Sequence, residues 1–216
     1  MADDRTVLLV VDVQSDFCPG GSLAVPDGDA VVPVVNALGR RFRHVVLTQD
    51  WHPAGHASFA SSHPGREPFE TIELDYGPQV LWPDHCVQGT TGAAFHAGLD
   101  LPHAEAVIRK GFRRGIDSYS GFIEADRRAR TGLEGYLRER GITRVVVAGL
   151  ATDFCVSWTA LDARRLTAQD AARAGFETSV VEDACRAIDL DGSLDRAWAE
   201  MAAAGIQRIA AATLML

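Results

Sequence analysis

Short apolar runs without polar alternation recur along this chain and are separated by stretches of helical periodicity. Runs of this kind are typical of parallel strands that are covered on both faces. We predict strands at Thr6–Val11, His44–Gln49, Ala106–Arg109, Val145–Ala148, Thr178–Val181 and Gln207–Ala211. We predict helices at Asp29–Arg43, at Thr131–Arg140, from Val156 onward and at about Ser193–Ala204. Because alternating strands and helices form βαβ units, the pattern predicts a doubly wound α/β fold with a mainly parallel six-stranded sheet and helices on both faces.

The length and composition indicate one large domain that spans residues 1–216. The chain has 216 residues, 47% of them hydrophobic, and no stretch resembles a linker or a low-complexity tract. The segment Trp51–His103 is rich in Gly, Pro and His and lacks regular periodicity. A segment this long without periodicity is more typical of a functional loop region than of a simple connector.

The charge pattern argues against nucleic acid and anionic membranes as partners, since the net charge is -8 and there is no basic cluster. A small molecule is the expected partner. The first residues lack the basic region of a signal peptide, and no apolar run approaches the length of a membrane span, so we expect a cytoplasmic protein. The four cysteines have no paired spacing and are expected to be free thiols.

Four residues with useful chemistry each follow or end a different predicted strand. They are Asp12, Asp50, Lys110 and Cys155. In open α/β sheets, ligands bind beyond the carboxyl ends of the strands, which all meet at one edge. Each residue alone is more often structural, as a core aspartate or a solvated lysine. Their joint placement favours a functional site.

The turn that follows the strand Val145–Ala148 places a cysteine at the start of a helix. Gly149 breaks the β-branched run, Thr152 or Asp153 is expected to cap the helix, and Cys155 falls in its first turn. Unpaired N–H groups and the helix dipole at that position favour a thiolate, which a cysteine nucleophile needs. The alternative is that Cys155 is a small buried hydrophobic residue.

Of the 21 lysine and arginine residues only Lys110 is a lysine. A compact ammonium beside a reactive atom cannot be replaced by a guanidinium, although a leftover surface lysine is the alternative interpretation. Together with a cysteine and an aspartate it would support acyl transfer, in which the carboxylate takes the thiol proton and later gives it to a departing amine. The backbone N–H groups of Ala151 and Cys155 are candidate donors to the oxyanion.

A second group of residues in the loop region has the chemistry of a metal site. Asp50, His52 and His56 lie close together in sequence, and His85 comes later in the chain. Two histidines and a carboxylate suit Zn²⁺, Fe²⁺ or Mn²⁺, but loop histidines are often only solvated. The aromatic residues Phe17, Trp51, Trp82 and Tyr119 could hold a flat ligand, or could simply pack the loop.

Six motifs occur in a fixed order along the chain. They are VDVQSDFCPGGSLAV (11–25), QDWHPAGH (49–56), WPDHCV (82–87), RKG (109–111), DSYSGF (117–122) and GLATDFCV (149–156). With these motifs nearly the whole chain resembles the bacterial nicotinamidases, of the pyrazinamidase type, in the isochorismatase-like superfamily of cysteine hydrolases. The resemblance implies hydrolysis of nicotinamide, and also of pyrazinamide, in NAD salvage. It implies Cys155 as nucleophile, Asp12 as general base and acid, and Lys110 as the cation of a triad.

The resemblance further implies one divalent metal ion (Zn, Fe or Mn) held by Asp50, His52 and His85, with the substrate ring nitrogen approaching it. The fourth protein ligand varies within the family, so His56 or water would fill that place. The resemblance implies that the substrate pocket is lined by Phe17, Trp82, Tyr119 and Leu150. It also implies a cis peptide bond between Leu150 and Ala151, which aims the oxyanion donors. Phe154 stands where some relatives carry histidine or tyrosine, which would alter the pocket wall.

Two rival functions remain open from the sequence. Another amidase of the superfamily, acting on a carbamoyl or ureido group, would not need a metal for a ring nitrogen, so the Asp50, His52 and His85 set favours nicotinamide. A non-catalytic binding module of flavodoxin type would have no sensitivity to thiol alkylation. The segment Thr159–Leu166 is echoed by Thr167–Ala174, which predicts a longer helix or a protruding turn far from the catalytic edge. A role of this repeat in a homo-oligomer is left open.

Overall fold

The computed structural model describes residues 3–166 and 175–214 of the chain. Its main sheet has six strands in the order β5-β2-β1-β6-β7-β8, and every neighbouring pair is parallel. The strands are β1 (Thr6–Val11), β2 (His44–Asp50), β5 (Ala106–Lys110), β6 (Arg144–Leu150), β7 (Glu177–Arg186) and β8 (Gln207–Ile209). The predicted α/β fold with a parallel six-stranded sheet is therefore confirmed.

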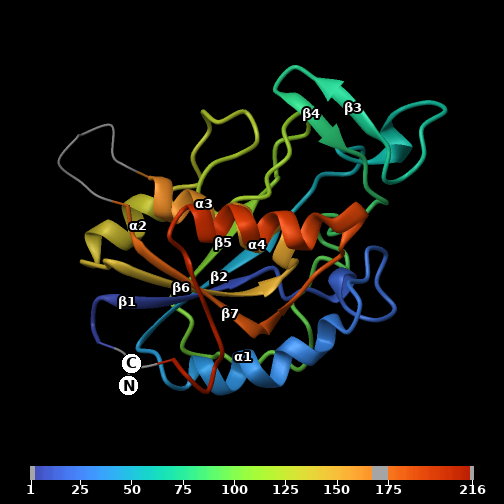
Figure 1. Cartoon of the computed structure of the whole chain (residues 1–216). Coiled ribbons are helices and arrows are strands. Elements are labelled where there is room, and N and C mark those ends of the chain that lie inside the picture. Colours follow the sequence, from blue (N-terminus) through green and yellow to red (C-terminus); the bar gives the residue numbers. More distant parts are fainter. Residues whose placement is uncertain (1–2, 167–174, 215–216) are drawn as a thin grey trace.

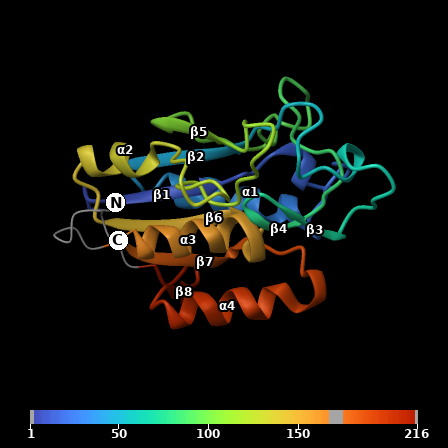
Figure 2. The same ribbon diagram turned by 90° about the horizontal axis from the view of Figure 1, so that it is seen from above.

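Helices cover both faces of this sheet (Figures 1 and 2). Helix α1 lies on one face, and the other three helices lie on the opposite face. Their bounds are α1 (Val31–Gly39), α2 (Leu133–Glu139), α3 (Ser157–Arg165) and α4 (Ser193–Ala203). Within residues 3–166 and 175–214, no helix is long and apolar enough to cross a bilayer.

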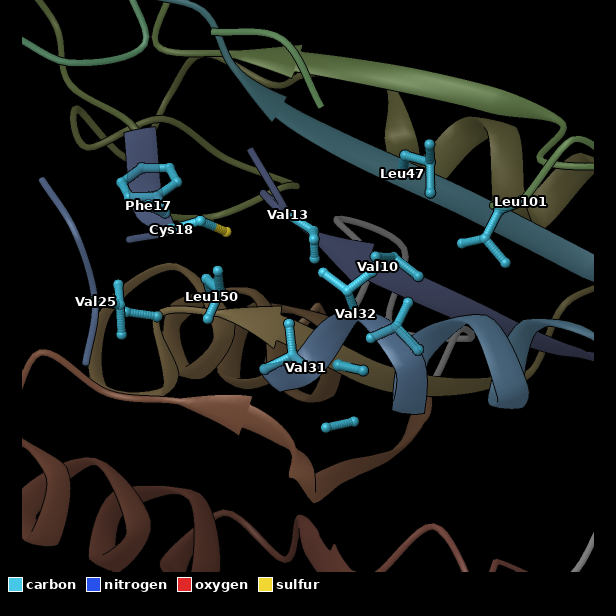
Figure 3. Packing of buried hydrophobic residues seen from close by; sticks show 14 of the residues in the cluster. Val10, Val13, Phe17, Cys18, Val25, Val31, Val32, Leu47, Leu101 and Leu150 are labelled. Atoms are coloured by element: carbon cyan, nitrogen blue, oxygen red, sulfur yellow. The ribbon is translucent and has the colours of Figure 1, made fainter. Parts of the chain in front are cut away.

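Successive residues of each central strand belong to two separate hydrophobic clusters. In β1, Leu8 and Val10 pack with α1, while Val7 and Leu9 pack with the helices of the other face. Figure 3 shows the α1 side, where Val10 lies close to the side chains of the helix. All these strand residues are at most 1% exposed, so the absence of polar alternation in the sequence reflects burial on both faces.

The observed elements differ from the predicted ones in length and in one addition. Helix α1 is shorter than the predicted Asp29–Arg43, because residues 28–30 form a 3₁₀ turn and the chain turns again after Gly39. Strand β7 is longer than predicted and has ten residues. The region 51–103 contains an antiparallel hairpin, β3 (Thr71–Leu74) and β4 (Gly77–Val80), which was not predicted. Its strands have only four residues each, and Pro78 argues against a strand.

The first copy of the eight-residue repeat, Thr159–Leu166, falls mostly within α3, which ends at Arg165. The second copy, Thr167–Ala174, lies outside the described residues. Because α3 ends before the second copy, the prediction of a longer α3 is wrong, whereas the alternative of a protruding turn lies outside the described residues and stays a prediction.

Gly149 is required by the close approach of β1 and β6. Its φ is +125°, and a Cβ atom added there would lie 2.1 Å from the carbonyl oxygen of Val11. Both the backbone conformation and the contact with main-chain atoms exclude a side chain. The glycine thus lets the strand that leads to Cys155 pack directly beside the strand that leads to Asp12.

We expect Gly149→Ala to destabilise the fold by about 3 kcal/mol or more, because the main chain of β1 would have to move. The free energy of unfolding in denaturant measures this effect. Gly135→Ala is the matched control, since Gly135 lies in α2 with no atom near its missing Cβ. That control should gain about 0.5–1 kcal/mol. Equal stability of the two variants would contradict the assignment of Gly149.

Candidate active site

The carboxyl ends of the strands bring the four predicted residues together around one ammonium group. Asp12 follows β1, Asp50 ends β2, Lys110 ends β5, and Cys155 lies in the turn after β6. The Nζ atom of Lys110 lies 2.9 Å from Asp12 Oδ2, 3.1 Å from Asp50 Oδ1 and 3.3 Å from Cys155 Sγ. It also donates to the carbonyl oxygen of Ser118 at 2.8 Å. A side chain with these four contacts and no exposed surface is fixed in place.

Cys155 lies in a single turn of π-helix, Thr152–Val156, that continues into α3. The carbonyl oxygen of Ala151 accepts from the N–H groups of both Phe154 and Val156. The peptide bond between Leu150 and Ala151 is cis, as the resemblance implied. π-Helical turns are rare and are frequent at functional sites.

The predicted side-chain cap of this helix is wrong. Neither Thr152 nor Asp153 caps the turn, which begins after Ala151. The buried carboxylate of Asp153 instead accepts from the N–H groups of Ile188 and Asp189, at 3.1 and 2.8 Å, and from the hydroxyl of Ser193. It therefore ties the turn that carries the cysteine to a loop that is distant in sequence.

The charges of the cluster are arranged around Lys110. Burial works against its ammonium form, but the carboxylates of Asp12 and Asp50 raise the pKa of Lys110 well above its ordinary value. Burial also raises the pKa of Asp12, and the charge of Lys110 opposes that rise. Lys110 is thus a permanent cation between two carboxyl groups.

We expected the position of Cys155 in the first helical turn to favour its thiolate form. That expectation is wrong for the buried surroundings that Cys155 has in the structure. Burial raises the pKa of the Cys155 thiol well above its ordinary value, and the nearby carboxylates add to the effect while Lys110 opposes it. Two carboxylates and only one ammonium lie nearby, so a further negative charge, on the sulfur, is disfavoured. For the sulfur to act as a nucleophile here, a base would have to accept the thiol proton.

Three buried side chains beside this cluster have the arrangement of metal ligands. The Oδ2 atom of Asp50 lies 3.0 Å from His52 Nε2 and 3.4 Å from His85 Nε2. The Nδ1 atom of His52 lies 2.9 Å from the carbonyl oxygen of Gly111, and the Nδ1 atom of His85 lies 2.8 Å from the carbonyl oxygen of Pro83. Because a carbonyl can only accept, both Nδ1 atoms must carry a proton, so in the neutral form of each ring Nε2 has the lone pair that could bind a cation.

The glycine of the RKG motif makes room for one of these rings. A Cβ atom added at Gly111 would lie 2.5 Å from His52 Cε1, and its φ is +64°. The three side chains therefore fit a single cation with N and O ligands.

His56 does not belong to this group. Its Nε2 lies 3.0 and 3.2 Å from the carbonyl oxygens of Arg113 and Ile116, and its Nδ1 lies 2.7 Å from the hydroxyl of Ser58. Burial lowers the pKa of His56 to about 4, so the ring is neutral at pH 7. Its ligand atom groups instead with His52 and Asp117. We interpret His56 as a structural residue that holds the loop 113–116.

A small cavity opens beside Cys155 and Asp50 and has mainly apolar walls. The predicted residues Phe17, Trp82 and Tyr119 line it, and so does Phe154. Trp82 and Phe154 meet edge to face at 4.9 Å, and Trp82 Nε1 donates to Tyr119 Oη at 3.0 Å. Leu150, which was expected to bind substrate, is fully buried in the core that faces α1 (Figure 3) and does not line the cavity.

Three further wall residues were missed from the sequence: Leu23, Asp117 and Ile188. Asp117 is buried and accepts from Gln79 Nε2 at 2.8 Å. It begins the DSYSGF motif, which was a usable signal. Leu23 lies in the motif at residues 11–25, which was a usable signal too, whereas Ile188 lies in none of the six motifs and reaches the cavity only through the tertiary fold.

Gln14 holds the main chain of Asp50 in place and was also missed. Its Oε1 accepts from the N–H group of Asp50 at 2.8 Å, and its Nε2 donates to the carbonyls of Asp50 and Ala93, each at 2.9 Å. The side chain has no exposed surface. The amide of Gln14 supplies the two donated bonds and the one accepted bond that these main-chain groups require.

We expect Gln14→Met to lower the free energy of unfolding by at least about 2 kcal/mol, because buried main-chain groups lose their partners. Denaturant unfolding provides the measurement. The control is Gln88→Met, which removes an exposed hydrogen bond to the carbonyl of Trp51 and should change stability by less than about 0.5 kcal/mol. A Gln14 variant as stable as this control would show that the clamp on Asp50 is unimportant.

Comparison with known families places this site in a class. The model of the isochorismatase domain matches residues 6–213. The chain therefore belongs to the isochorismatase family of hydrolases. It is 57% identical over 213 residues to a nicotinamidase of Acinetobacter baylyi, covering 99% of this chain and 96% of the relative.

Solved structures agree with this placement. A nicotinamidase and pyrazinamidase of Acinetobacter baumanii has 56% identity and a TM-score of 0.95, with 100% of both chains covered. A homologue from L. infantum in complex with nicotinate has 40% identity, a TM-score of 0.84 and coverage of 100% and 97%. A pyrazinamidase of Pyrococcus horikoshii in complex with zinc has 37% identity, a TM-score of 0.76 and coverage of 95% and 99%. The predicted resemblance and the predicted amidase class are confirmed.

Proposed function

We propose that this protein hydrolyses nicotinamide to nicotinate and ammonia through a thioester on Cys155. The observation that carries the proposal is the Lys110 ammonium, which lies within 3.3 Å of the Cys155 sulfur and 2.9 Å from the Asp12 carboxylate. A nucleophile, a base and a cation so arranged suit acyl transfer. The relatives named as nicotinamidases, and the homologue with bound nicotinate, support the choice of substrate.

In the first half-reaction, Asp12 takes the thiol proton while the sulfur bonds to the amide carbon. The tetrahedral intermediate then collapses, the carbon–nitrogen bond breaks, and Asp12 returns the proton to the departing nitrogen, which leaves as ammonia. The Lys110 ammonium offsets the negative charge that passes between sulfur and carboxylate. The N–H groups of Ala151 and Cys155, in the turn before α3, are proposed donors to the oxyanion.

In the second half-reaction, Asp12 takes a proton from water while the water oxygen bonds to the thioester carbon. The carbon–sulfur bond then breaks, the sulfur regains the proton, and nicotinic acid leaves and loses its remaining proton to the solvent to give nicotinate. The same carboxylate acts as base and acid in each half, so no further proton carrier is needed.

The ring of the substrate is proposed to lie between Phe17, Trp82, Tyr119 and the side chain of Phe154. A divalent ion, Zn, Fe or Mn, would be held by Asp50, His52 and His85 and would bind the ring nitrogen as a Lewis acid, fixing the ring relative to Cys155. The zinc complex of the Pyrococcus relative supports this assignment. Relatives named for both nicotinamidase and pyrazinamidase activity support pyrazinamide as a proposed second substrate.

These assignments extend to the role of the protein in the cell. We propose that residues 1–216 form a single domain that acts in the cytoplasm, where release of nicotinate would feed NAD salvage. The proposed partner of the site is a small-molecule amide. The competing proposal of a carbamoyl or ureido amidase is tested by assaying both substrate classes with the same preparation.

We expect Cys155→Ala to lower ammonia release from nicotinamide by more than about 1,000-fold, because no thioester can form. Thermal unfolding within a few degrees of the parent serves as the folding control. Cys185→Ala is the matched variant, since this buried cysteine lies in β7 outside the proposed triad. Turnover by Cys155→Ala within tenfold of the parent would refute the nucleophile.

Lys110→Arg should lower kcat/KM by at least about 100-fold. The Lys110 ammonium is fully buried and makes four contacts, and a planar guanidinium cannot reproduce them. Steady-state ammonia release measures the effect. Arg109→Lys, the reverse exchange at the adjacent position, is expected to retain most of the activity. A near-normal rate for Lys110→Arg would show that its contacts are incidental.

Removal of metal with a chelator is expected to abolish turnover, and return of Zn²⁺, Fe²⁺ or Mn²⁺ should restore it. Elemental analysis should find about one metal ion per chain in the parent and in a His96→Asn control. His52→Asn and His85→Asn should each lose most of that metal. Full turnover by a protein shown to be metal-free would refute the proposed role of these residues.

A further inference from the structure

The proposed base, Asp12, is held by a neighbouring side chain that is not part of the triad. Asp12 has a φ of 47°, which is uncommon for a residue other than glycine. Its carboxylate has no exposed surface and therefore takes its orientation entirely from protein groups. Among the residues that the structure describes, Thr48 contacts both the main chain and the side chain of Asp12.

The hydroxyl of Thr48 makes two hydrogen bonds to Asp12. It accepts from the N–H group of Asp12 at 3.3 Å and donates to Oδ1 at 2.6 Å. Since a hydroxyl has a single hydrogen, its donor is fully used by Oδ1. The bond to Oδ1 turns the other oxygen, Oδ2, towards Lys110 Nζ at 2.9 Å. Oδ2 has no other hydrogen-bond partner within the described part of the chain, so it is the oxygen available to the reacting groups.

The side chain of Thr48 is itself fixed. It lies near the end of β2, adjacent to β1, and is fully buried. A Cβ atom added at Gly121 would lie 3.0 Å from its methyl group, so the glycine leaves just enough room for that methyl. A β-branched residue with a packed methyl has one preferred χ1, and this directs the hydroxyl at Asp12.

We propose that Thr48 is a positioning residue for the general base: it binds Oδ1 of Asp12 and thereby directs Oδ2 to the proton that is transferred. This role rests on the proposed function of Asp12. The arrangement parallels catalytic groups in which a third side chain orients the base for the nucleophile. Its effect should appear in the chemical step and leave ring binding intact, because Thr48 does not line the cavity.

Thr48→Val and Thr48→Ser separate the hydroxyl from the methyl group. Thr48→Val keeps the shape but loses both hydrogen bonds to Asp12, and we expect kcat for nicotinamide to fall tenfold or more with KM within threefold of the parent. Thr48→Ser keeps the hydroxyl and should retain kcat within threefold. Thr178→Val is the matched control. It removes a buried hydroxyl in β7 that donates to the carbonyl of Phe176, and it should keep the parental kcat.

A crystal structure of Thr48→Val adds a test that does not depend on activity. We expect the Asp12 carboxylate to rotate away from the position in which Oδ2 faces Lys110. An unmoved carboxylate, a Thr48→Val kcat within threefold of the parent, or an equal loss in Thr48→Ser would each overturn the role of Thr48. An inactive parent protein would overturn the proposed function and this role with it, whereas an active parent with a fully active Thr48→Val overturns only the role of Thr48.

Discussion

The ammonium of Lys110 is the interaction on which the rest of the site depends. An isolated buried ammonium would cost several kcal/mol in lost hydration, and it is tolerated here because two carboxylates and the Ser118 carbonyl surround it. In turn those carboxylates, at the ends of β1 and β2, would repel each other without the cation. The strand ends can therefore come together only as a charged set. The contacts on several sides of one atom suit the compact ammonium of a lysine better than the planar fork of a guanidinium, in a chain that otherwise uses arginine.

The backbone brings these groups together through features that are unfavourable in isolation. β1 and β6 approach so closely that position 149 must be glycine, and Asp12 adopts a left-handed conformation as soon as β1 ends. The cost of these two backbone features is offset by the parallel sheet, in which β1 pairs with β6 over its whole length, from Thr6 to Val11. The core on each side of the sheet is rigid enough to impose local conformations that the residues would otherwise avoid.

Features that depend on local patterns could be predicted from the sequence. Buried strands read as continuous apolar runs, and the polar residue at each strand end was visible because the run stops there, so the fold and the convergence of Asp12, Asp50, Lys110 and Cys155 could be predicted.

Contacts made by distant segments could not be predicted from local patterns. Asp153 looks like a helix cap from its neighbours but binds the loop at Ile188 and Asp189, and Gln14 has no local sign that it binds Asp50. Leu150, which the resemblance implied as a pocket residue, packs instead in the core that faces α1, and an apolar run buried on both faces has no polar pattern that would have shown this.

The cation cluster and the candidate metal ligands form one unit, because they share a residue. Asp50 presents Oδ1 to Lys110 and Oδ2 to His52 and His85, while Gln14 fixes its main chain. A single carboxylate with both oxygens engaged thereby links the Lys110 ammonium, which contacts the Cys155 sulfur, to the two candidate histidine ligands. A displacement of Asp50 would move both groups at once, so substitutions on its two sides act through a common residue. Their effects on turnover should not add, as is general for side chains that share a buried partner.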